Sequence, residues 1–171
     1  MKHVPLFLFM LLLPFLSYSQ NQDYKKYIPL SYVEIDSLMY IEYNKGAYDK
    51  AIPLMQAGRE KAKIDFGEQD SAFAEYTNNL GFFYNEMGNY EKALPLYIQA
   101  KNIYEKVLGL EHPSFASLLT NLALLHKAMG NYEEALPLLI QAKNIYEKVL
   151  GLAHPSFAIS LNNLAALHQV M

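Results

Sequence analysis

The 171-residue sequence contains no cysteine. This absence excludes thiol catalysis, disulfide bonds, thiolate metal sites and an N-terminal cysteine modified by lipid. The sequence also has no cluster of lysine and arginine, and its formal net charge is -3. Nucleic-acid-binding proteins usually carry a strongly basic face, so nucleic acid is not expected as a partner.

Motifs of common enzyme chemistry are missing too, including Gly-x-Ser-x-Gly, His-Glu-x-x-His and Gly-x-x-x-x-Gly-Lys. Asp65-Phe66-Gly67 spells the metal-binding triplet of protein kinases, but no other kinase motif accompanies it, and a helix ending at Gly67 explains it. Glu133 and Glu134 are interpreted as acids in the first turn of a helix, where the helix dipole favours them. We expect no catalytic residue and no cofactor.

Residues 1–19 have the pattern of a cleavable export signal. A weakly basic start is followed by an apolar stretch over residues 4–16 and by small residues before Gln20. An uncleaved membrane anchor is the alternative, but the stretch is shorter than the roughly 20 residues that a spanning helix needs, and Pro14 interrupts it. We expect a periplasmic or extracellular protein. Residues 20–30 are interpreted as a polar lead-in segment.

The rest of the chain repeats with a period of 42 residues. Residues 88–129 and 130–171 are identical at 33 of 42 aligned positions, and a related unit precedes them. A fixed period of this length indicates stacked helical units instead of one globular core. Apolar residues recur at helical spacing within each unit, which predicts a pair of helices.

Asparagine, glycine and proline residues mark the predicted helix ends. Asn89 and Asn131 are suited to cap the start of each second helix, and Gly109 and Gly151 are suited to the left-handed residue after it. Pro113 is expected to begin the next first helix, where a missing amide hydrogen costs nothing. Prolines 53, 95 and 137 lie in the second turn and are expected to bend the helix without breaking it.

Histidines recur in phase as the pairs His112 and His154, and His126 and His168. Stacked units place equivalent residues about 10 Å apart, whereas one metal needs ligand bonds near 2 Å. No metal site is expected.

Small residues after Leu80 and Leu122, together with Gly88, Tyr90 and Ala93, resemble the tetratricopeptide-repeat (TPR) pattern. The 42-residue period and the strings Asn-Ile-Tyr-Glu-Lys-Val-Leu-Gly and His-Pro-Ser-Phe-Ala resemble the kinesin-light-chain-like subclass, which is abundant in bacterial proteins. The resemblance implies an all-α solenoid of stacked antiparallel helix pairs. Its predicted units are a degenerate, capping first repeat at residues 31–70, repeats at 71–112 and 113–154, and the first helix of a truncated repeat at 155–171.

In this subclass, the first helices line a concave groove that binds an extended peptide, and asparagines there can bond the peptide backbone. The resemblance therefore implies a peptide-binding groove formed by Asn78, Asn79, Phe82, Asn121, Leu124, Lys127, Asn162 and Asn163. A second interpretation remains equally open, in which the asparagines bond neighbouring helices and hold the stack together. The groove lacks the basic set with which chaperone-tail-binding relatives clamp a terminal carboxylate.

The predicted last helix has an apolar face, with Leu161, Leu164, Leu167 and Val170, that no following helix of this chain covers. It marks either a truncation or an interaction site, including self-association with a second chain. The function predicted from the sequence is a non-catalytic protein–protein interaction module. The alternative is the sensor or scaffold part of a larger effector, such as a caspase-like peptidase or a signalling kinase, whose catalytic domain is absent from this chain.

Overall fold

The computed structural model describes residues 23–171, so the export signal predicted at residues 1–19 lies outside the described residues. The described chain forms one short 3₁₀ helix and seven α-helices and contains no strand. In chain order they are η1 (Asp23–Tyr27), α2 (Tyr32–Asn44), α3 (Tyr48–Phe66), α4 (Ser71–Glu86), α5 (Tyr90–Val107), α6 (Pro113–Ala128), α7 (Tyr132–Leu150) and α8 (Pro155–His168). None of these helices is long and apolar enough to cross a membrane.

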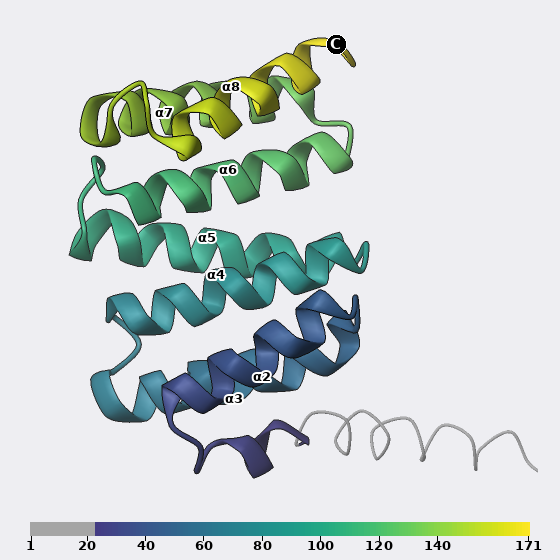
Figure 1. The fold of residues 1–171 in the computed structure, drawn as a ribbon, viewed down its shortest axis with the longest axis vertical. Coiled ribbons are helices and arrows are strands. Elements are labelled where there is room, and N and C mark those ends of the chain that lie inside the picture. Colours follow the sequence, from purple (N-terminus) through teal and green to yellow (C-terminus); the bar gives the residue numbers. More distant parts are fainter. Residues whose placement is uncertain (1–22) are drawn as a thin grey trace, which may run out of the picture.

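The helices follow one another in a single stack from α2 to α8 (Figure 1). From α2 to α8, each α-helix packs on its neighbouring α-helices in the chain, and η1 packs on α3. The predicted all-α solenoid is therefore confirmed over residues 23–171. In the lead-in, Tyr24, Tyr27, Ile28 and Leu30 pack against the core.

The turn inside each helix pair is fixed mainly by backbone geometry. Gly88 adopts a φ of +71°, which side-chain-bearing residues rarely adopt, and the amide of Asn89 then donates to the carbonyl of Tyr84 at 2.8 Å. The third unit repeats this arrangement at Gly130, where the amide of Asn131 donates to the carbonyl of His126 at 2.8 Å.

Side-chain caps agree with the sequence at one of the two predicted positions. The Asn89 side chain accepts a hydrogen bond from the amide of Lys92 at 3.3 Å, whereas Asn131 occupies the predicted N-cap position of α7 but its side chain makes no cap bond. The turn already holds the backbone there, and Ala47 starts α3 at the equivalent place without any side-chain cap. Pro113 begins α6 as predicted.

The predicted left-handed residues are also found, since Gly109 and Gly151 have φ values of +83° and +84°. Helices α3, α5 and α7 continue unbroken through their internal prolines, Pro53, Pro95 and Pro137.

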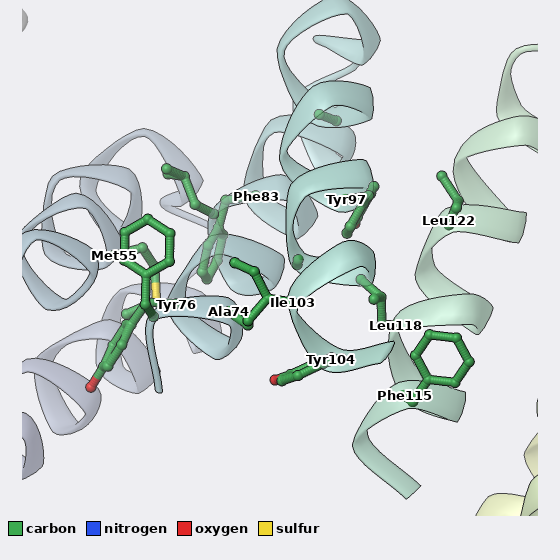
Figure 2. Close-up of a cluster of buried hydrophobic side chains, with 14 of the residues drawn as sticks. Met55, Ala74, Tyr76, Phe83, Tyr97, Ile103, Tyr104, Phe115, Leu118 and Leu122 are labelled. Carbon is green, nitrogen blue, oxygen red and sulfur yellow. The ribbon is translucent and has the colours of Figure 1, made fainter. Parts of the chain in front are cut away.

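The core is a band of side chains that passes from one helix to the next. Figure 2 shows it running from α3 and α4 through α5, with Tyr97 and Tyr104, to Phe115, Leu118 and Leu122 on α6. Among the largest fully buried side chains are Tyr97, Phe73, Phe83 and Phe115.

Glycines make room for tyrosines in the first half of the stack. A Cβ on Gly58 would lie 2.3 Å from Cε1 of Tyr76, and a Cβ on Gly81 would lie 3.0 Å from Cε1 of Tyr97. Gly58 departs from the repeat pattern because its neighbour in space is a tyrosine, where the next unit has Leu118 instead. The departure is a packing compensation.

Helix α8 has apolar residues at the same positions as α6, but they are more exposed to solvent. Leu119 of α6 is 0% exposed, whereas the equivalent Leu161 of α8 is 44% exposed. Ala123 is buried and the equivalent Ala165 is exposed. In α6, Ala123 belongs to an apolar cluster with Ala135 and Leu139 of α7.

Candidate functional site: the inner face of the helix stack

The first helices of successive units lie next to one another: α2 and α4 line one hollow together, and α6 and α8 line another. We call the surface that α2, α4, α6 and α8 form the inner face. Helices α4 and α6 contact each other directly across the boundary between units. Two hollows open on this face, one between α2 and α4 and the other between α6 and α8.

The aromatic hollow lies between α2 and α4 and has a volume of about 240 Å³. Its walls are Met39, Tyr40, Tyr43, Asn79, Phe82 and Phe83. The rings of Tyr43 and Phe82 lie 6.0 Å apart, and those of Phe82 and Phe83 lie 5.4 Å apart in an edge-to-face arrangement. Tyr40 is 61% exposed, so a large aromatic surface is open to solvent here.

A row of asparagines connects α4 and α6. Nδ2 of Asn121 donates to Oδ1 of Asn78 at 3.1 Å, and Nδ2 of Asn78 is 3.4 Å from Oδ1 of Asn79. Asn78 is only 7% exposed, so it holds the stack together and has little surface for a ligand. Asn79 and Asn121 are half-buried and border the hollows.

The polar hollow lies between α6 and α8 and has a volume of about 370 Å³. Most of the residues in its walls carry a hydroxyl or amide group, and they are Ser117, Thr120, Asn121, Leu124, Tyr146, Ser156, Ile159, Ser160 and Asn163. Burial raises the pKa of Tyr146, while the nearby hydroxyls of Ser117 and Thr120 oppose the rise. The phenol therefore stays neutral at physiological pH.

The hollows bring together five of the eight residues predicted for the groove, namely Asn79, Phe82, Asn121, Leu124 and Asn163. Asn78 lies between them in the asparagine row. Lys127 is half-buried on α6 and Asn162 is exposed on α8, and neither lines a hollow.

The sequence prediction missed the contribution of α2. Tyr40 lies one period before Phe82, which itself precedes Leu124 by one period, so the 42-residue step was the signal that could have found it. It was overlooked because the first unit departs from the repeat pattern elsewhere. Tyr146 was also missed, since it lines the polar hollow but belongs to α7, the second helix of its unit.

Two carboxylates lie one helical turn before the residues of the aromatic hollow. Asp36 precedes Tyr40 on α2, and Glu75 precedes Asn79 on α4. The hydroxyl of Tyr76 donates to Oδ1 of Asp36 at 2.8 Å. Burial raises the pKa of Glu75, and the charge of Asp36 adds to that rise.

One of the two histidine pairs, His112 and His154, caps helix ends. Nδ1 of His112 accepts a hydrogen bond from the amide of Ser114 at 3.1 Å, and Nδ1 of His154 accepts from the amide of Ser156 at the same distance. Both imidazoles therefore cap the starts of first helices. Over residues 23–171, no three His, Asp or Glu side chains gather as a metal site would require.

Stacked helix pairs with a 42-residue step define the molecule as a helical-repeat solenoid. Two family models for the tetratricopeptide repeat match it, one over residues 70–126 and the other over residues 115–156. Together they span just over half of the chain, which therefore belongs to the tetratricopeptide-repeat family. No curated protein matches the sequence.

Solved structures place the fold among kinesin-light-chain-like repeat proteins. BtubC (BKLC) from P. vanneervenii superposes with a TM-score of 0.72 at 22% identity, covering 90% of this chain and 64% of that one. A putative kinesin light chain from Podosopora anserina, with nearly identical TPR-like repeats, gives a TM-score of 0.71 at 26% identity, covering 79% and 64%. The chain thus spans less than two thirds of the length of either.

A third similar structure contains a bound segment. PcrH, in complex with the chaperone binding region of PopD, gives a TM-score of 0.57 at 22% identity and covers 83% of this chain and 96% of that one. At this identity the likeness concerns the fold alone.

Proposed function

We propose that the chain is a non-catalytic interaction module that binds an extended peptide or protein segment along its inner face. The observation that carries this proposal is the position of the two hollows on one face, separated by a row of amide groups. Amides can both donate to and accept from a peptide backbone, and the aromatic hollow can bury one large side chain. The TPR fold and the segment bound by PcrH support the same kind of partner.

Some residues of the inner face hold the stack together and others only line the hollows, and this difference decides which of them a binding test should change. Asn78 is buried and bonded to Asn121, so replacing either one weakens the stack as well as the site. Tyr40 and Asn163 line the two hollows and take no part in that bond. They are the better probes of binding.

The experiment selects binders for the full chain from a random library of 12-residue peptides and measures the affinity of a selected peptide by fluorescence anisotropy. We expect Tyr40→Ala to weaken binding about tenfold, because the peptide loses its apolar contact with the ring of Tyr40. Asn163→Ala should weaken it about fivefold through the loss of one hydrogen bond.

Ile98→Ala is the matched control, since Ile98 is an apolar residue of second helix α5 with 46% exposure. Its affinity should equal that of the wild type. Binding that depends on Ile98 and not on Tyr40 or Asn163 would place the site elsewhere and refute the inner-face assignment.

We also propose that residues 1–19 direct export and are then removed, so that the partner is met outside the cytoplasm. N-terminal sequencing of the exported chain should begin at Gln20. A chain that is recovered with Met1 or Lys2 at its start would contradict cleavage.

A further inference from the structure

The half of the inner face formed by α2 and α4 carries only negative charge. Neither helix contains a lysine or arginine, and Glu75 and Glu86 are the charged residues of α4. Helix α6, by contrast, has Lys127 and no acid, and α8 has no Asp, Glu, Lys or Arg. Any preference of the inner face for a cationic ligand therefore arises in the α2–α4 half.

Not all the acids of α2 and α4 are available. Glu34 closes the capping box of α2, and Glu42 pairs with Lys45. Asp36 and Glu75 keep solvent-accessible surface, although the surroundings of Glu75 are crowded enough to raise its pKa. Neither residue belongs to an ion pair among residues 23–171. Burial and the charge of Asp36 both raise the pKa of Glu75.

The aromatic hollow begins one turn further along the same two helices. A helix rises about 1.5 Å per residue, so Asp36 lies about 6 Å from Tyr40 and about 10 Å from Tyr43 along α2. An extended peptide rises about 3.3 Å per residue, and two or three of its residues span this distance. An acidic pair alone would be an ordinary solvated surface; the adjoining hollow makes it one half of a two-point contact.

We propose that the inner face selects segments in which a large apolar or aromatic side chain lies two or three residues from a lysine or arginine. The apolar side chain enters the aromatic hollow, and the cation lies between Asp36 and Glu75. This inference rests on the proposed function, because it specifies the peptide that the same face binds.

The peptide selection described above supplies the first test. The enriched sequences should share one basic and one large apolar residue at this spacing. The affinity of one such peptide is then compared with that of its Lys→Gln form, against the wild type and against the double variant Asp36→Asn, Glu75→Gln. Amide side chains preserve the size and can still accept the hydrogen bond of Tyr76.

For the lysine peptide, we expect the double variant to bind about tenfold more weakly at low salt, since two partly exposed charge contacts are lost. The Lys→Gln peptide should bind the wild type and the double variant equally. Added salt should weaken only the binding of the lysine peptide to the wild-type chain. Glu91→Gln, which removes an exposed acid from second helix α5, is the matched control and should leave every affinity unchanged.

Selected peptides that bind through Tyr40 but lack a basic residue, or that bind the double variant as well as the wild type, would overturn this inference and leave the proposed function standing. A selection that yields no binder would refute both.

Discussion

The α4–α5 pair and the α6–α7 pair have the same backbone turns but fill the space between their helices differently. Where the first has Gly81 against Tyr97, the second has Ala123 with Leu139 in its apolar core. The boundary between units changes in the same way, from Gly58 with Tyr76 to the equivalent Ala100 and Leu118. A smaller residue on one helix accompanies a larger residue on its neighbour, so the repeat preserves the fit of a pair and not each residue.

The comparison implies that the two kinds of pair cannot be exchanged one residue at a time. Gly58→Ala places a Cβ within 2.3 Å of Tyr76, whose ring is buried and whose hydroxyl is bonded to Asp36. Overpacking costs about 1–3 kcal/mol, and better helix propensity returns about 1 kcal/mol. We expect the free energy of unfolding in urea to fall by up to about 2 kcal/mol.

The same substitution should change sign when its neighbour is also converted. In a Tyr76→Leu background, which reproduces the Ala–Leu pair of the next unit, Gly58→Ala should stabilise the chain by up to about 1 kcal/mol. Gly81→Ala serves as an intermediate control because its Cβ would lie 3.0 Å from Tyr97. If Gly58→Ala stabilises the native background, the pairing argument fails.

These pairs also explain what could be predicted from the sequence. The helix pairs and their order could be predicted because glycines such as Gly88 and Gly130, and Pro113, recur in phase and act through local backbone geometry. The role of Gly58 could not, since it depends on a ring that arrives from the next helix. By periodicity alone, Gly58 is only a departure from Ala100 and Ala142, the residues at the equivalent position of the later units.

The candidate site likewise contains residues whose position depends on their own helix and residues whose position depends on a neighbouring helix. Asn79 and Phe82, which were predicted for the groove, line the aromatic hollow that opens beside their own helix. Asn78 lies next to them in sequence, yet it is buried against Asn121 of α6. Whether a residue at the edge of a helix meets solvent or its neighbour depends on how closely α4 and α6 approach, which the sequence does not reveal.

A smaller effect is expected from the polar atom that Tyr97 brings into the core. Its hydroxyl is buried and has no hydrogen-bond partner among the described residues, whereas the equivalent Leu139 has no polar atom to satisfy. An unpaired buried hydroxyl costs about 1–3 kcal/mol. Tyr97→Phe keeps the ring that faces Gly81 and should raise the free energy of unfolding by about 1 kcal/mol.

The pH dependence of this gain follows from the state of the phenol. Burial raises the pKa of Tyr97, and the charge of Glu86 adds to the rise, so the folded chain keeps a proton that the unfolded chain releases above about pH 10. The unfolded state then binds fewer protons, and the stability of the wild type falls as the pH rises through this range. Phenylalanine has no such proton, so the stability advantage of Tyr97→Phe over the wild type should grow above pH 10.

Tyr76→Phe is the matched control and should have the opposite effect on stability, because it removes a hydroxyl bonded to Asp36 at 2.8 Å. Urea unfolding at pH 7 and at pH 10.5 measures both variants, and a loss of stability in Tyr97→Phe would show that its hydroxyl has a partner after all.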